Sequence, residues 1–167
     1  MSRFDSLQTL PGARIEWPGG GESQQIELRI NGTPLLELVR AVELPLAELE
    51  RDGSGGADRS PQAPAGDYLY LSPSDTFFPS RNLYGAAYQH GFDVGPTDSS
   101  RGKSVLLTCT CGIPDCWFLL AKIEVDQERV VWSAFEQFHR DWDYSALGPF
   151  VFERAAYDGA LRKRVPG

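Results

Sequence analysis

Features that mark membrane-spanning or secreted proteins are missing from this sequence. No run of about 18 apolar residues occurs, and residues 1–10 hold no basic segment followed by a long apolar stretch. The 3 cysteines are odd in number and cluster within residues 109–116, unlike the even, dispersed cysteines of a secreted disulfide protein. We therefore expect neither membrane insertion nor secretion, but a cytoplasmic protein with reduced thiols.

Basic residues are too few to attract nucleic acid. The 16 lysines and arginines stand against 23 aspartates and glutamates, so the net charge is −7. Electrostatic forces of that sign repel phosphate backbones and anionic lipid surfaces. We therefore expect no nucleic acid and no membrane among the partners, and a protein with a cationic patch is the better complement.

Nucleotide-binding motifs are also missing. Glycine-rich runs occur at residues 19–21 and 53–56, but neither precedes the Gly-Lys-Ser/Thr of a phosphate-binding loop or has the spacing of a dinucleotide-binding motif. Both runs are typical of flexible turns.

The sequence does contain enough apolar material for one α+β domain. Hydrophobic residues make up 41% of the 167, which suffices to close a core without disulfides or metals. Alternation at 14–17 and 25–30, with turn residues between, predicts an N-terminal hairpin. Segments 104–109, 116–125 and 129–135 are strand-like and joined by short turns, which predicts an antiparallel three-stranded meander.

A first helix is predicted from a cap and from apolar spacing. Thr33 can cap a helix whose first position is Pro34, and apolar residues then recur at helical spacing. The residues expected on its buried side are Leu35, Leu38, Val39 and Val42. Those expected on its solvent side are Glu37, Arg40 and Glu43.

A second helix is predicted over residues 152–163, where Arg154, Tyr157 and Leu161 share one stripe. With the hairpin and the meander, it gives a single α+β domain over residues 1–167, in which two helices pack on an antiparallel sheet.

Two segments lack a regular pattern. Residues 51–66 are rich in Gly, Pro, Ser and Asp and have little to bury, so we predict a flexible loop. Residues 68–88 are aromatic but interrupted by proline and glycine, which predicts coil with short strand or turn pieces.

The densest chemical feature is Cys-Thr-Cys-Gly-Ile-Pro-Asp-Cys at 109–116. Gly112 and Pro114 permit a tight reversal that returns the third cysteine toward the first two. A structural zinc site needs four soft or borderline ligands at tetrahedral angles. The candidate zinc ligands are Cys109, Cys111, Cys116 and His139.

The same cysteines have other interpretations. Residues two apart on a strand face the same way, so Cys109 and Cys111 can simply continue a buried row, as free cysteines often do. A thiol enzyme could instead use Cys116 with His139 as its base, but chains of this length contain such residues by chance. A disulfide across the turn is a third use. The sequence leaves these interpretations open.

Aromatic and charged residues alternate within 136–144, which predicts a recognition surface, since Trp, Tyr and Arg contribute most at protein interfaces. The residues of this predicted surface are Phe138, His139, Arg140, Trp142, Asp143 and Tyr144. In the alternative, the aromatic members close the edge of the core and the charged ones are solvated.

Four short strings stand out in the second half of the chain: Val105-Leu-Leu-Thr-Cys-Thr-Cys-Gly112, Cys116-Trp117, Trp142-Asp-Tyr144 and Gly148-Pro-Phe150. Together they resemble an uncharacterised family of bacterial proteins, and the likeness covers mainly residues 68–161. The resemblance implies a bacterial origin and an intracellular location. It implies no activity, because none is established for that family.

The leading functional hypothesis is a non-enzymatic protein-binding module, of the immunity or antitoxin kind, with another protein as its partner and no cofactor. The alternative is a small zinc- or thiol-dependent enzyme, with a zinc ion as cofactor in the first case. The residues of that alternative are Cys109, Cys111, Cys116 and His139.

The zinc hypothesis predicts a stoichiometric metal in the purified protein. Elemental analysis should find zinc in the wild type and not in a Cys111→Ser variant, because a tetrahedral site does not survive loss of one of its thiolates. Metal-free wild-type protein would contradict this hypothesis.

Overall fold

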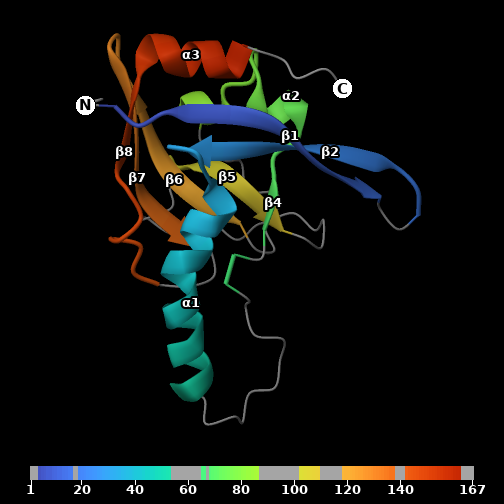
Figure 1. Cartoon of the computed structure of the whole chain (residues 1–167), viewed down its shortest axis with the longest axis vertical. Helices are drawn as coiled ribbons and strands as arrows, with labels where there is room; N and C mark the ends of the chain where they lie inside the picture. Colours follow the sequence, from blue (N-terminus) through green and yellow to red (C-terminus); the bar gives the residue numbers. More distant parts are fainter. Residues whose placement is uncertain are drawn as a thin grey trace.

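Two antiparallel sheets and two longer helices make up the described part of the protein, which we describe from a computed structural model (Figure 1). The described residues are 4–16, 19–53, 65–66, 68–86, 102–109, 118–137 and 142–162, with the backbone alone at 50–53 and 109. The strands are β1 (Leu7–Glu16), β2 (Glu22–Ile30), β3 (Thr33–Pro34), β4 (Tyr68–Tyr70), β5 (Ser104–Cys109), β6 (Leu119–Val125), β7 (Arg129–Gln137) and β8 (Phe150–Glu153). The helices are α1 (Leu35–Gly53), α2 (Pro73–Thr76) and α3 (Arg154–Arg162), with a 3-10 turn, η1 (Asn82–Tyr84). The predicted α+β class is confirmed.

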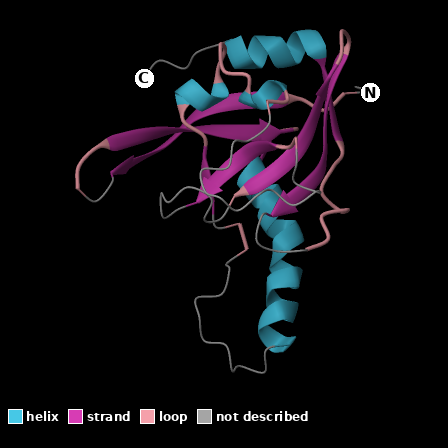
Figure 2. Ribbon diagram, turned by 180° about the vertical axis from the view of Figure 1, so that it is seen from behind, coloured by secondary structure: helices cyan, strands magenta, loops and turns pink. Residues whose placement is uncertain are grey.

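The predicted N-terminal hairpin is present and forms a sheet of order β1-β2-β3. Side chains two apart on β2 point the same way, and Ile26, Leu28 and Ile30 are buried on that face. The first strand is longer than predicted, since it begins at Leu7. The part of the hairpin next to its turn projects from the body in both ribbon views (Figure 1, Figure 2).

The predicted meander is the centre of a five-stranded antiparallel sheet of order β4-β5-β6-β7-β8. The short strands β4 and β8 add an edge on either side of the predicted three. The inner strands carry most of the core, which includes Leu106, Leu119 and Trp132, all with 0% exposure. The core forms here because these strands place their apolar side chains against both the hairpin and α3.

A β-bulge in β7 shifts the alternation of inward-facing and outward-facing side chains along that strand. Lys122 pairs with Ser133 and Leu120 pairs with Glu136, so β7 has one extra residue opposite β6. The extra residue is Ala134, which has a φ of 51° and is exposed. Because the bulge shifts the phase by one residue, Phe135 faces inward as Trp132 does.

The hairpin connects the two edges of the five-stranded sheet. Next to β8, the backbone N–H of Asp5 donates to the Val151 carbonyl at 2.7 Å, and the Asp5 carboxylate accepts from the Val151 N–H at 2.8 Å. Next to β4, the Tyr70 N–H donates to the Gln25 side chain at 2.8 Å and the Ile26 N–H donates to the Leu71 carbonyl at 2.9 Å. Polar groups of both sheet edges are thereby satisfied within the molecule.

The first helix starts one residue later than predicted and runs further. Thr33 and Pro34 pair with β2 as a short strand, so the helix begins at Leu35. It continues to Gly53, so the first residues of the predicted 51–66 loop are helical, and 54–64 lie outside the described residues. The start of α1 contacts the first sheet, and its later turns extend away from the sheets (Figure 1).

The second predicted helix is α3. It begins at Arg154, so the prediction that it starts at Phe152 is wrong. Phe152 pairs with Val130 in the sheet and its side chain is buried, which makes it the last inward-facing residue of β8. Of the predicted stripe, Tyr157 and Leu161 are buried and Arg154 is partly exposed. Segment 68–86 contains short strand and turn pieces as predicted, and also the short helix α2, which was not predicted, while 87–88 lie outside the described residues. None of the helices in the described part of the chain is long and apolar enough to cross a membrane.

The bulge makes a stability prediction. Ala134→Gly should raise the free energy of unfolding by about 0.5–1 kcal/mol. A left-handed backbone costs an L-residue about 1–2 kcal/mol, which glycine avoids, and the larger backbone entropy that glycine loses on folding offsets only part of this gain. Chemical denaturation would measure the change. In Ala13→Gly, an exposed strand alanine outside the positive-φ set, the same substitution should be destabilising. Equal effects at both positions would contradict the strain argument.

Candidate functional site

The predicted zinc ligands fall mostly outside the described residues. Cys109 ends β5, where its backbone pairs with Tyr68, and Cys111, Cys116 and His139 are not described. Within the described part of the chain, no group of three or more His, Cys, Asp or Glu residues is placed to hold a metal ion. The zinc site therefore stays a prediction.

The predicted recognition surface at 138–144 is described from Trp142 onward. Trp142 is half-buried and packs against the core, and exposed Asp143 accepts a hydrogen bond from the Ser145 N–H at 2.9 Å. Tyr144 is only 5% exposed and its hydroxyl points to Glu43. For these aromatic residues the alternative interpretation, closure of the core edge, agrees with their positions. Phe138, His139 and Arg140 lie outside the described residues.

Glu43 is buried, so the prediction that it faces solvent is wrong. It follows Leu35 and Val39 at four-residue spacing, and all three have 0% exposure. Its carboxylate accepts hydrogen bonds from the Tyr144 hydroxyl at 2.5 Å, the Tyr68 hydroxyl at 2.6 Å and the Gly66 N–H at 2.8 Å. These three donors replace the water that the carboxylate loses, and they tie α1 to β4 and to the segment before β8.

Burial dominates the titration of this cluster. It raises the pKa of Glu43, and the three hydrogen bonds to the carboxylate oppose that rise. Burial, together with the nearby charge of Glu43, also raises the pKa of Tyr68 and of Tyr144 far above the ordinary range. Both hydroxyls therefore stay protonated donors, which is the role of a structural tie.

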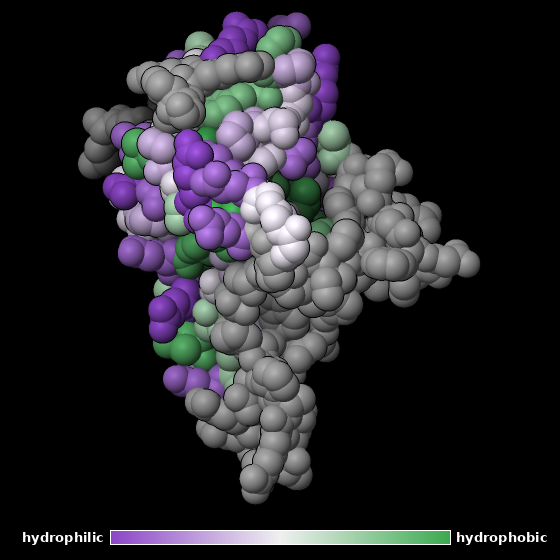
Figure 3. All heavy atoms as spheres, turned by 90° about the vertical axis from the view of Figure 1, so that its right-hand side faces the viewer, coloured by the Kyte–Doolittle hydropathy of each residue, from purple (hydrophilic) through white to green (hydrophobic). Residues whose placement is uncertain are grey.

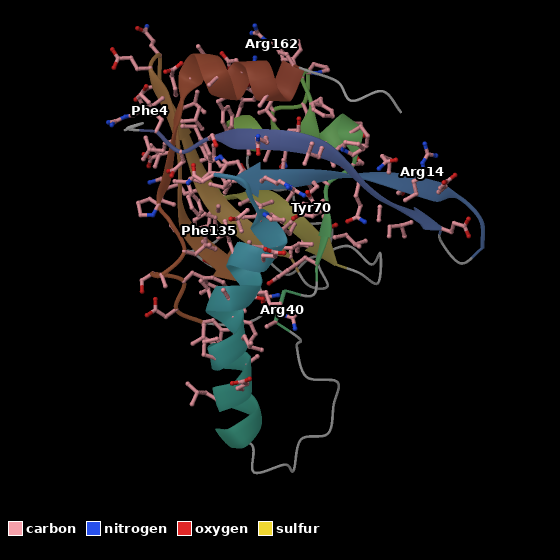
Figure 4. All side chains as sticks on the ribbon, viewed as in Figure 1. Phe4, Arg14, Arg40, Tyr70, Phe135 and Arg162 are labelled. Atoms are coloured by element: carbon pink, nitrogen blue, oxygen red, sulfur yellow. The ribbon has the colours of Figure 1, made fainter. Side chains whose placement is uncertain are left out.

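A cleft lies between α3 and the segment 78–84, and its volume is about 200 Å³. We call it the arginine cleft. The residues that line it are Phe78, Ser80, Arg81, Tyr84, Arg154, Asp158 and Arg162. Figure 4 shows Arg162 on α3 at the top of the molecule and Arg14 on the hairpin that projects to the right.

Bonds between α3 and the 78–84 segment hold the two walls of the arginine cleft together. The buried Tyr157 hydroxyl donates to the Leu83 carbonyl and accepts from the Trp132 indole N–H at 3.1 Å. The Phe78 N–H donates to the Leu161 carbonyl at 3.0 Å. The rings of Tyr84 and Tyr157 meet edge to face, with centroids 5.5 Å apart. The core thus positions both walls.

The charges in the arginine cleft do not cancel. The Arg154 guanidinium donates to both oxygens of Asp158, at 3.1 and 3.2 Å, and the Tyr84 hydroxyl donates to Asp158 at 2.8 Å. Burial, helped by this hydrogen bond, raises the pKa of Tyr84 to about 12. Arg81 and Arg162 are both exposed, and neither forms an ion pair with a residue in the described part of the chain. Two positive charges therefore remain available.

Two rings flank these charges. The Arg162 guanidinium carbon lies 5.9 Å from the ring centroid of Phe78, and that of Arg154 lies 5.9 Å from the ring of Tyr84. Phe78 is 52% exposed, although it is a large hydrophobic residue. The arginine cleft therefore offers cations and an apolar ring side by side.

Sequence reasoning did not find the arginine cleft. One signal was present, because Arg154, Asp158 and Arg162 recur every four residues and so share one face of α3. The other wall had no periodic signal, since Phe78 and Arg81 lie in a segment predicted as coil.

Comparison of the chain with protein-family models, with curated proteins and with solved structures finds no match. Functional inference therefore depends on the geometry of the described residues.

The Glu43 cluster predicts a pH-dependent stability difference. Glu43→Gln should lower the free energy of unfolding by about 1–3 kcal/mol, because one of the three buried donors loses its acceptor. Folding raises the pKa of Glu43 above its ordinary value of 4.5. The stabilisation that comes from binding this proton is therefore fully present below that value and is lost as pH rises through the folded pKa. The difference between wild type and Glu43→Gln should therefore narrow as pH rises.

Urea denaturation at a series of pH values from about 4 to 8 would measure this difference. The control is Glu37→Gln, an exposed glutamate on the same helix, which should show no such trend. A difference that widens with pH would contradict the raised pKa.

Proposed function

We propose that this chain is a cytoplasmic, non-enzymatic protein-binding module that holds its partner through the arginine cleft. The observation that supports the proposal is the pair Arg81 and Arg162, two arginines without an ion-pair partner among the described residues, beside the exposed ring of Phe78. Arginine and aromatic side chains contribute most of the free energy at protein interfaces. Here they are grouped in a depression whose walls are bonded together.

Among the described residues that line the arginine cleft, the polar groups are arranged for binding and not for catalysis. Asp158 is held by Arg154 and Tyr84, the Tyr84 pKa of about 12 keeps its hydroxyl protonated, and the Ser80 hydroxyl donates to the Asp75 carbonyl at 3.0 Å. The Ser80 hydroxyl is thus bonded to a backbone carbonyl and not to a base, and the Tyr84 hydroxyl, whose partner is Asp158, keeps its proton, whereas nucleophilic catalysis requires a hydroxyl that a base deprotonates.

The hairpin tip is a weaker candidate for the contact surface. Arg14 and Glu22 form an exposed ion pair there at 3.3 Å, and charged side chains on edge strands discourage pairing with another chain. On the face toward which the hairpin points, hydrophilic and hydrophobic residues are mixed over the upper part of the described surface (Figure 3). An exposed pair of this kind adds little free energy to an interface.

Affinity capture with purified, tagged protein would test the proposal. A defined partner should be retained in stoichiometric amount by the wild type, and its capture should fall about tenfold or more in Arg81→Gln and Phe78→Ser, because each removes a contact of interface size. Both side chains are exposed, so neither substitution disturbs the core.

Two further variants serve as controls. Arg14→Gln removes the same charge on the hairpin and should retain the partner. Trp142→Ala probes the surface predicted at 138–144 and should also retain it. If Trp142→Ala lost the partner while Arg81→Gln retained it fully, the contact surface would not be the arginine cleft.

A further inference from the structure

The geometry points to the chemistry of the segment that occupies the arginine cleft: we infer that the partner inserts one carboxylate together with an adjacent apolar side chain. This inference rests on the proposed function. It assigns the carboxylate to Arg81 and Arg162 and the apolar side chain to Phe78.

The cations of the cleft suit an oxyanion. A guanidinium presents its N–H donors in a planar fork that matches a carboxylate or a phosphate in two parallel hydrogen bonds. Arg154 already donates its Nε–H to Asp158 and an Nη1–H to the Asp126 carbonyl, while Arg81 and Arg162 have no ion-pair partner among the described residues. An incoming oxyanion can therefore accept hydrogen bonds from Arg81 and Arg162 without displacing an ion-pair partner among the described residues.

The acid in the wall favours a single negative charge over a doubly charged group. Asp158 lines the same cleft, so a phosphate group, which carries about −1.5 to −2 charges at neutral pH, would be repelled more than a carboxylate. The net charge of −7 acts in the same direction on any partner with many phosphates. A single carboxylate on a partner that is otherwise neutral or basic satisfies both conditions.

The size and the exposed ring define the rest of the segment. A volume of about 200 Å³ is smaller than the roughly 300–1,000 Å³ of typical small-molecule and cofactor sites, so the cleft accepts one or two side chains. Phe78 remains 52% exposed even with Arg162 near its ring. An apolar side chain next to the carboxylate would remove this ring from water, which is the favourable term that a carboxylate alone does not supply.

The cleft is already in the conformation that binding requires. Tyr157 fixes Leu83, and the Leu161 carbonyl fixes Phe78, so the backbone of both walls is tied to the core. Placement of Arg162 near Phe78 limits the freedom that its side chain would lose on binding.

Titration with short peptides would test the inference. The probes are the amidated dipeptides N-acetyl-Glu-Phe and N-acetyl-Gln-Phe, with N-acetyl-phosphoserine-Phe and inorganic phosphate for comparison. The readout is the NMR signal of the arginine Nε–H groups. N-acetyl-Glu-Phe-amide should shift the Arg81 and Arg162 signals in a saturable way, and it should bind about tenfold more tightly than its Gln counterpart, as expected for a charge-assisted hydrogen bond.

Matched variants separate the cleft from general charge effects. Arg81→Gln and Phe78→Ser should each weaken binding of N-acetyl-Glu-Phe-amide about tenfold or more, and Arg14→Gln should leave it unchanged. Tighter binding of the phosphoserine peptide or of phosphate would overturn the choice of a carboxylate. Equal binding of the Glu and Gln peptides, or no binding by either, would overturn the inference as a whole, while partner capture that depends on Arg81 would still support the proposed function.

Discussion

The attachment of the hairpin to both edges of the five-stranded sheet is the constraint on which the rest of the structure depends. Asp5 pairs with Val151 at one edge, and Gln25 and Ile26 pair with β4 at the other. A curled sheet with open edges would leave a row of backbone donors and acceptors unpaired and its apolar face half covered. The hairpin supplies partners for both edges and covers the core with the inward face of β2, so the two sheets form one body.

The arginine cleft is a consequence of the same core. α3 lies over β1, where the Thr9 hydroxyl donates to the Ala160 carbonyl at 3.2 Å, and it inserts Tyr157 between Trp132 and Leu83. That buried hydroxyl bonds to a carbonyl 74 residues away in the chain, which places the 78–84 segment along the helix. Charged groups on the outside of α3 and on that segment therefore face a common depression. The walls of the cleft are held in place because their supports are buried, while Arg81 and Arg162 are exposed to an incoming ligand.

A basic cleft on an acidic protein separates two electrostatic tasks. The net charge of −7 acts at long range and disfavours polyanions, whereas in the proposed complex Arg81 and Arg162 would act over hydrogen-bond distances on a single group. The proposed complex would thus select a partner by both its overall charge and one local acid. The buried Glu43 shows the converse case inside the protein, where a carboxylate is matched by three donors and none of the described residues brings a cation to hydrogen-bond distance.

The amino-acid sequence by itself determined the strands of the hairpin and of the meander, because their alternation has a period of two residues and is read within one segment. It also determined the buried stripe of α3 through Tyr157 and Leu161. Only the tertiary structure decided that Glu43 is buried, because its hydroxyl donors lie 25 and 101 residues away in the chain. It also decided that Phe152 pairs in a strand and is not part of a helix. The arginine cleft belongs to the second group, since its two walls are distant in sequence and only one of them has a periodic pattern. Local periodicity records which face of a segment is apolar, but the groups that this face meets are set by packing between segments far apart in the chain.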